Sequence, residues 1–443
     1  KRKITEIYQK NGYIDPIVSI NYELKENNVE IYISIKPGKK RFFGKSIILG
    51  NKKTKTKFIY DRLIPKDKAS YNPYILEEER QMLYKTGLFS RVDIYTQRLG
   101  ESIDVIYMLD ETPAGAIEFG LGYGEYEKVK GFIELSYINF LGTNKQIFSR
   151  IELSTLEKRS YLTYVDPWLW KDLIFKSTIG YEDLEFKSID TKKLLYKIKK
   201  LGFSVGLEKK LSEKFKIELL YEGAYSKTSN VLPEIVISDV DVGKLFISGF
   251  RGSVIYDTRN NPFDPQKGWL AGMSSKISLD AIGSEINFSK TSFYINKYTE
   301  ILKNLVLATS LRGGLIGLYG DTKDVPISER FFLGGRETVR GYAQNTLGPK
   351  NNNQPTGGNA FLIGNIEMRY SIGKNFFLVN FLDFGNVWKK LGEVKVTDLK
   401  YTAGLGLRYK TPIGPIRIDY GHKLNRERNE SNGEIHFSIG HAF

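Results

Sequence analysis

The chain has 443 residues and a formal net charge of +15, from 66 basic and 51 acidic residues. This length exceeds that of one ordinary domain, and the positive balance is typical of proteins with anionic partners, such as nucleic acid, lipid headgroups or lipopolysaccharide. The basic residues are scattered through alternating segments and form no single stripe, which argues against nucleic acid. A general enrichment in Lys, Ile, Asn and Tyr explains the charge equally well.

The composition gives little support to enzyme or metal chemistry. There is no cysteine, which excludes disulfides, thiolate metal sites and thiol nucleophiles. The histidines are His422, His436 and His441, and this small number makes a catalytic triad or a zinc site improbable. The glycine-rich stretch 120–124 resembles a phosphate loop only superficially, because no helix follows it and it alternates as a strand does. We therefore expect neither an enzyme nor a bound cofactor or metal.

Residues 1–36 predict the last part of an α+β module. Residues 1–11 are expected as the end of a helix that stops at Gly12, and residues 16–24 and 29–36 as two strands joined by the turn 25–28. The chain opens with Lys1, Arg2, Lys3 and Ile4, without an apolar signal stretch. We therefore expect the true N-terminus to lie upstream or to have been removed.

Residues 37–112 predict a complete α+β module. A strand at 42–49 precedes a short helix at 54–63, and Asn72 with Pro73 marks the start of a second helix, as a cap followed by proline in the first turn. Gly87 ends that helix, and strands at 91–97 and 102–109 close the unit. Apolar pairs seven residues apart predict the face that packs on the sheet, namely Ile75, Leu76, Met82 and Leu83.

From Pro113 onward the hydrophobic period is two, as in β-strands. Ile435, Phe437 and Ile439, for example, alternate with Glu434, His436 and Ser438. Charged residues on the second face are incompatible with a dry core and fit a water-filled lumen. No run of about 18 apolar residues occurs, which argues against a membrane-spanning helix. The 28 Tyr and 26 Phe suit the aromatic girdles of a membrane barrel.

Residues 113–443 are therefore predicted to form a 16-stranded antiparallel transmembrane β-barrel. Closure of the barrel leaves no unpaired strand edge in lipid, and the remaining length accommodates strands of about 9–11 residues. The sixteen alternating segments start near Ala116, Gly131, Gln146, Tyr161, Leu173, Leu195, Lys214, Ile247, Trp269, Ile286, Leu305, Asn359, Phe376, Tyr401, Ile413 and Gly433. A passive porin would share this pattern.

One connection, at about residues 320–358, is much longer than the others and shows little alternation. It contains Gly334, Gly335, Gly341 and Pro349, followed by the polar stretch 351–354. Long connections without regular structure are usually functional or disordered.

An ordered set of motifs resembles the BamA/TamA outer-membrane assembly superfamily. The long loop carries Val339, Arg340, Gly341 and Tyr342, within the run 331–342. Further matching stretches are residues 257–269, 357–360, 384–388 and 411–417. The order strand, helix, helix, strand, strand in residues 37–112, with Gly87, Leu88 and Phe89 opening the fourth element, resembles a POTRA domain. The resemblance extends over essentially the whole chain.

The resemblance implies a bacterial outer-membrane protein, with its POTRA-like modules in the periplasm, that inserts β-barrel proteins through a lateral seam. It also implies that Arg340 pairs with acidic residues of the inner wall, for which Glu367 and Asp383 are the candidates. Glu367 alternates with Ile366 and Met368, so the pattern itself predicts that it faces the lumen. The predicted seam joins the first and last strands and includes Gly120, Gly122, Gly124, Gly440 and the terminal Phe443.

The implied partners are unfolded outer-membrane protein clients, membrane lipid with lipopolysaccharide, and periplasmic accessory proteins that bind the POTRA-like modules. Two other functions within this resemblance stay open. One is a TamA-like translocation and assembly factor, and the other is a secretion pore for an attached or partner passenger.

Overall fold

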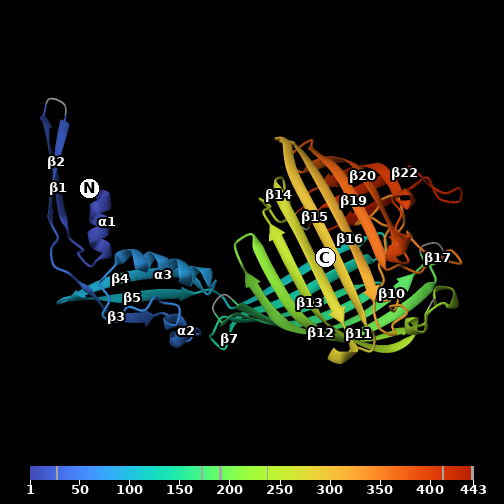
Figure 1. The fold of residues 1–443 in the computed structure, drawn as a ribbon, viewed down its shortest axis with the longest axis horizontal. Helices are drawn as coiled ribbons and strands as arrows, with labels where there is room; N and C mark the ends of the chain where they lie inside the picture. The colour runs from blue at the N-terminus through green and yellow to red at the C-terminus, as the bar shows by residue number, and fades with distance from the viewer. Residues whose placement is uncertain (26–27, 171–172, 189–191, 237, 412–413, 441–443) are drawn as a thin grey trace. The chain divides into compact units, whose positions relative to one another are not determined.

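The computed structural model describes residues 1–443 apart from 26–27, 171–172, 189–191, 237, 412–413 and 441–443 (Figure 1). The chain divides into two compact units. The first comprises Lys1–Ala116 with Ser136–Ile147, and the second comprises Ile117–Leu135 with Phe148–Phe443. Among the helices of the described residues, none combines the length and the apolar character needed to cross a membrane.

The first unit begins with helix α1 (Arg2–Lys10) and an antiparallel ribbon of two strands, β1 (Ile17–Lys25) and β2 (Asn28–Lys36). A three-stranded sheet with two helices follows. Its elements in chain order are β3 (Phe42–Leu49), α2 (Thr56–Tyr60), α3 (Pro73–Lys85), β4 (Phe89–Leu99) and β5 (Ser102–Glu111). Strand β5 lies in the middle of the sheet, parallel to β3 and antiparallel to β4.

Helix α3 starts where the sequence predicts, because the Asn72 side chain accepts a hydrogen bond from the Tyr74 backbone N–H at 3.0 Å. Leu76 and Leu83 are buried in the core against the sheet, but Met82 is 42% exposed, so its predicted place on the packed face is wrong. The position between the two leucines is taken by Glu79, which is fully buried.

Glu79 belongs to a buried polar cluster with Lys66 and Tyr107. The Lys66 ammonium donates to both Glu79 carboxylate oxygens at 2.5 and 2.7 Å, and the Tyr107 hydroxyl donates to Oε2 at 2.5 Å. Burial lowers the pKa of Lys66, against the effect of the Glu79 hydrogen bond and charge. Because each member satisfies the others, the cluster fits inside an otherwise apolar core.

The second unit contains most of a closed barrel of sixteen antiparallel strands within the described residues, which confirms the predicted barrel and its strand number. Its strands are β6 (Gly115–Gly124), β7 (Lys128–Phe140), β8 (Lys145–Ser154), β9 (Glu157–Trp170), β10 (Leu173–Lys187), β11 (Leu194–Lys210), β12 (Phe215–Ser229), β13 (Gly243–Asp257), β14 (Gly268–Ser278), β15 (Phe288–Leu302), β16 (Leu305–Leu318), β19 (Ala360–Ser371), β20 (Phe376–Trp388), β21 (Lys400–Tyr409), β22 (Ile416–Lys423) and β23 (Gly433–Ile439). The predicted strand start at Ile413 lies outside the described residues.

Short elements occupy some of the connections. The 3-10 helices are η1 (Pro233–Ile235), η2 (Asp239–Asp241), η3 (Asp280–Ile282), η4 (Leu391–Glu393) and η5 (Val396–Asp398). Strands β17 (Lys350–Asn351) and β18 (Gln354–Pro355) form a small hairpin within the long loop.

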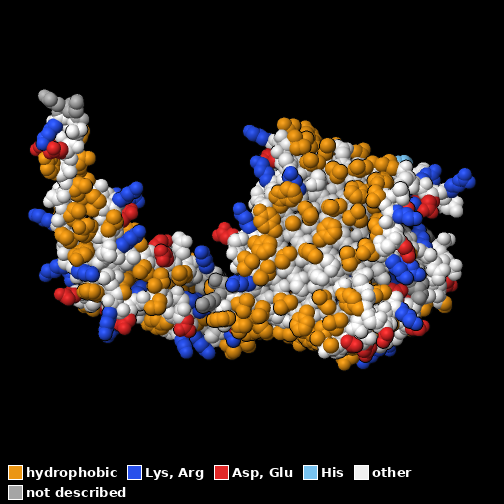
Figure 2. All heavy atoms as spheres, viewed as in Figure 1, with side chains coloured by type: hydrophobic (Ala, Val, Ile, Leu, Met, Phe, Trp, Pro, Cys, Tyr) orange, Lys and Arg blue, Asp and Glu red, His pale blue; other side chains and the backbone are white. Residues whose placement is uncertain are grey.

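The alternating pattern places apolar side chains outside and polar ones inside the barrel. Ile117, Phe119 and Leu121 of β6 are 72%, 77% and 69% exposed on the outer face, and Figure 2 shows hydrophobic side chains spread over the outer face of the strands. On the inner face, Thr402 and Asp419 are buried although they are polar. This is the arrangement that a barrel needs when lipid surrounds it.

The loop between β16 and β19 packs inside the barrel against strands far apart around its circumference. Near its start, Val325 packs with Ile247 of β13 and Phe288 of β15, and Ile327 packs with Leu195 of β11. Further along, Leu333, Val339, Tyr342 and Leu347 form an apolar cluster with Ile363 of β19 and Val387 of β20. The loop therefore crosses the lumen instead of extending outward.

Candidate functional site

The loop arginine Arg340 lies at the inner wall of the barrel, where its side chain is almost fully buried. Its Nε and Nη2 donate to the two carboxylate oxygens of Asp383 on β20, both at 2.7 Å, and its backbone N–H donates to Oδ2 at 3.0 Å. Its Nη1 donates to Glu367 Oε1 on β19 at 2.7 Å. A planar guanidinium can make this fork to one carboxylate and still reach a second one.

The turn after Arg340 depends on glycine. Gly341 has a φ of 91°, in the region that side chains of L-residues disfavour. A Cβ at this position would lie 2.8 Å from the backbone oxygen of Gly421 on β22. The absence of a side chain thus permits both the backbone conformation and the close approach of the loop to β22.

Glu367 is shared by three arginines. Besides Arg340, it accepts from Arg408 of β21 at 2.8 Å and from Arg369 of its own strand at 2.8 Å. The Arg340 guanidinium also lies 3.5 Å from the centre of the Phe381 ring, a distance at which cation and ring attract each other. The two acids proposed from the sequence, Glu367 and Asp383, therefore both contact Arg340 within one network.

Sequence reasoning missed several members of this network. Asp419 of β22 lies 3.9 Å from Arg340 Nη1, and its alternation with Ile418 and Tyr420 already indicated a lumen-facing carboxylate. A second buried pair holds the start of the loop, because Arg330 donates to Asp241 of η2 at 2.7 Å. No local pattern marks Asp241, since its partner is distant in the sequence.

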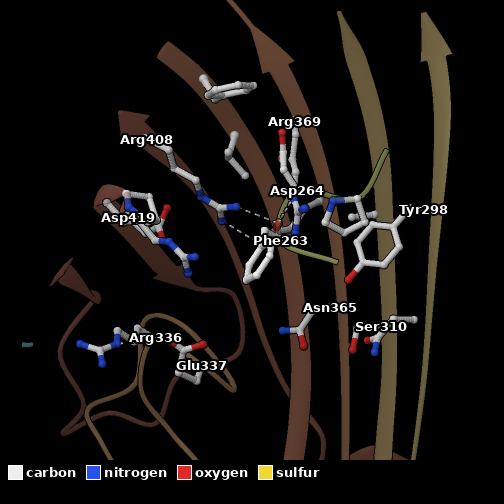
Figure 3. Close-up of a pocket in the computed structure, with 18 of the residues that line it drawn as sticks. Phe263, Asp264, Tyr298, Ser310, Arg336, Glu337, Asn365, Arg369, Arg408 and Asp419 are labelled. Atoms are coloured by element: carbon white, nitrogen blue, oxygen red, sulfur yellow. Dashed lines mark hydrogen bonds and ion pairs between the residues drawn. The ribbon is translucent and has the colours of Figure 1, made fainter. Parts of the chain in front are cut away.

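A cavity of about 640 Å³ lies beside the network, within the described part of the barrel. Figure 3 shows Arg408 and Asp419 projecting toward it, together with Phe263 and Asp264 from the turn between β13 and β14. The described residues hold no group of three or more His, Cys, Asp or Glu side chains that could bind a metal ion. The charged side chains of the network form ion pairs and hydrogen bonds with one another.

The junction between the first and last strands differs from its neighbour. Among the described residues, β23 pairs with β22 at seven positions but with β6 at two, namely Ser438 with Gly124 and Ile439 with Tyr123. A Cβ on Gly122 would lie 2.9 Å from the backbone oxygen of Ile439, so glycine permits this approach. We name the junction of β6 with β23 the seam.

The other predicted seam residues have different positions. Gly120 belongs to β6 but is not paired with β23 in the described residues. Gly440 follows β23 with a φ of 92°, and its backbone N–H donates to the Pro415 oxygen at 3.1 Å, next to the last pair of β22 and β23. Phe443 lies outside the described residues.

The closed barrel, its apolar outer face and the loop packed into its lumen define the class of an outer-membrane β-barrel with an internal loop. Comparison with known proteins specifies the family. Residues 139–443 match the model of the Omp85 superfamily domain, and the chain belongs to this superfamily, as the motifs of the long loop indicated. It is a protein of the bacterial outer membrane.

Individual relatives agree with the family. The chain is 23% identical over 490 residues to the outer membrane protein assembly factor BamA of Neisseria meningitidis, covering 98% of this chain and 60% of that protein. It thus spans about three fifths of the length of this curated relative. A crystal structure of BamA from Haemophilus ducreyi lacking POTRA domains 1–3 matches with a TM-score of 0.84 and 21% identity, covering 99% of this chain and 92% of that one. CdiB from Acinetobacter baumannii matches with a TM-score of 0.55 and 15% identity, over 97% of this chain and 78% of that one.

Proposed function

We propose that the chain is the membrane-anchored part of a factor that inserts β-barrel proteins into the outer membrane through its seam. The observation that carries the proposal is the difference in pairing among the described residues, seven positions between β22 and β23 against two between β6 and β23. Strand edges with free backbone N–H and C=O groups are templates for the addition of another strand. A client strand can therefore pair with β6 once the seam opens toward lipid.

The loop network is the second element of the proposal. Arg340, Glu367 and Asp383 connect the loop to β19 and β20, on the side of the barrel that leads to the last strand. The role that we assign to Arg340 is to keep this wall and the loop in one arrangement while the seam opens. No cofactor is needed, since the client exchanges hydrogen bonds with water for hydrogen bonds with strands.

We further propose that residues 1–36 are the last part of a POTRA-like module, that residues 37–112 form a complete one, and that residues 113–443 form the barrel with its inward loop at about 320–358. The sheet order β3-β5-β4, with β3 and β4 as its edges, supports this assignment. Both edges offer backbone groups to periplasmic accessory proteins or clients. The proposed partners also include outer-membrane lipid and lipopolysaccharide around the barrel.

The decisive experiment locks the seam. Because the chain has no cysteine, the double substitution Tyr123→Cys and Ile439→Cys introduces one disulfide at a position where the two strands are paired. Proteoliposomes containing the locked protein should fail to assemble a client barrel, and reductant should restore assembly. Clients and lipid are the same in both arms, so the comparison isolates the seam.

A matched control locks the neighbouring junction. Tyr420→Cys with Ile435→Cys joins β22 to β23, where those two residues are partners. This variant should assemble clients with and without reductant. Full assembly of clients by the seam-locked protein would contradict the proposal. The alternative of a secretion pore would then be tested by measuring export of a passenger protein.

A further inference from the structure

A buried histidine connects the seam to the loop. His436 of β23 is 2% exposed, and its Nε2 accepts a hydrogen bond from the Gly341 backbone N–H at 2.9 Å. Its Nδ1 is hydrogen-bonded to the carboxylate of Glu125, in the turn directly after β6. The other Glu125 oxygen accepts from the Phe437 backbone N–H at 3.3 Å. Three segments therefore meet at one imidazole ring, namely the end of β6, the last strand and the loop.

The partners determine the protonation of the ring. A backbone N–H can only donate, so Nε2 must carry a lone pair. A carboxylate can only accept, so Nδ1 must carry the proton. The neutral imidazole with its proton on Nδ1 satisfies both contacts at once, and a doubly protonated ring would place a donor against the Gly341 donor.

We propose that His436 and Glu125 are positioning residues that couple the seam to the loop, with one imidazole nitrogen holding β6 and the other holding Gly341. The inference rests on the proposed function of the seam. Because backbone pairing between β6 and β23 is short among the described residues, side-chain contacts of this kind decide how tightly the junction closes. The loop salt bridge from Arg336 to Glu127, at 3.5 Å, joins the loop to the same turn.

Other ionisable groups lie around His436. Asp419 is its direct partner on β22, and the cavities that His436 lines also include Arg336, Arg340 and Arg417, as well as Glu434, Tyr126, Lys128, Lys187 and Lys192.

Two conservative substitutions separate the two contacts. In His436→Asn the amide N–H₂ takes approximately the place of Nδ1 and can reach Glu125, but nothing accepts from Gly341. In His436→Gln the amide oxygen reaches the place of Nε2 and can accept from Gly341, but the contact to Glu125 is lost. Glu125→Gln keeps one acceptor oxygen, which can serve His436 but leaves the Phe437 N–H without its partner, whereas Glu125→Ala removes both acceptors.

Two thiol measurements on the purified protein, without any client, report the seam and the loop. The crosslinking rate of the Tyr123→Cys, Ile439→Cys pair reports seam closure. The labelling rate of Val339→Cys, at a loop position with 0% exposure, reports loop release. We expect His436→Asn to raise loop labelling about tenfold, the loss of one buried hydrogen bond, with little change at the seam. His436→Gln and Glu125→Ala should slow seam crosslinking by a similar factor, and Glu125→Gln, which keeps the acceptor for His436, should restore part of the rate.

The matched control is His422→Gln, a substitution of an exposed histidine on the neighbouring strand, which should change neither rate. If both His436 variants changed both rates alike, the coupling would be refuted. Failure of the assembly proposal alone would leave these client-free rates as expected.

Discussion

Removal of the Arg340 side chain tests whether the loop is held by its buried ion pairs. Asp383, whose side chain is fully buried, keeps in Arg340→Ala the hydrogen bonds from Asn365 at 2.8 Å and from the backbone N–H of residue 340 at 3.0 Å, but loses the paired guanidinium bonds at 2.7 Å. Breaking a buried pair by removal of one partner costs about 3–5 kcal/mol. This cost corresponds to an increase of roughly two to four orders of magnitude in the equilibrium constant for loop release.

The barrel itself should survive this loss, because its strands are held by backbone hydrogen bonds that Arg340 does not make. The assay is protease cleavage within the loop, measured on protein in membranes, together with heat-modifiable migration in gels as the readout of barrel folding. Arg340→Lys should recover only part of the protection, since an ammonium cannot fork across a carboxylate and reach Glu367 as well.

Arg369→Ala is the matched control for charge removal. Arg369 also pairs with Glu367, at 2.8 Å, but its side chain is 27% exposed, and exposed pairs contribute about 0–1 kcal/mol. Its loop should stay nearly as protected as in the parent protein. If Arg340→Ala protected the loop as well as Arg369→Ala does, the buried network would not be what holds the loop, and the reasoning would be refuted.

Two further predictions concern a turn and a core. Gly341→Ala should favour loop release by at least roughly 1–2 kcal/mol, the free-energy cost of a side chain in the left-handed region. The control is Gly392→Ala, where an added Cβ meets nothing within 4 Å, and the same protease assay should show no change for it. Glu79→Leu should destabilise the N-terminal unit by about 3–5 kcal/mol because it leaves the buried Lys66 ammonium without its carboxylate partner. The measurement is proteolysis of residues 37–112 in urea. Adding Lys66→Met should recover most of the lost stability, and no recovery would contradict the reasoning.

The sequence predicts the barrel well because lipid and lumen impose opposite polarities on alternate residues of every strand. Strand ends are less predictable: β13 begins at Gly243, before the apolar pattern starts near Ile247, since a strand continues wherever its neighbour offers backbone partners. Helix α3 shows the same limit, because apolar spacing alone favoured Met82 over Glu79 for the packed face. A buried carboxylate is predictable only when its buried partner is known.

Some contacts of the candidate site could likewise be predicted from the sequence, and others could not. Arg340 and Glu367 were accessible through the loop motif and through alternation, respectively. The contact between Glu125 and His436 was not, because these residues are separated by 311 positions and meet only when the barrel closes with a particular register. Closure of a barrel creates neighbours that no local pattern contains.

The path of the loop has a consequence for permeability. From Val325 beside β13 and β15 to Tyr342 beside β19 and β20, the loop occupies the interior that a porin of similar strand number leaves open to ions. The intact protein should therefore show low ion conductance in a planar bilayer. The same contacts that hold the loop in place should limit ion flow through the barrel. If the barrel admits strands from the side, as proposed, this loop prevents solutes from leaking along its axis at the same time.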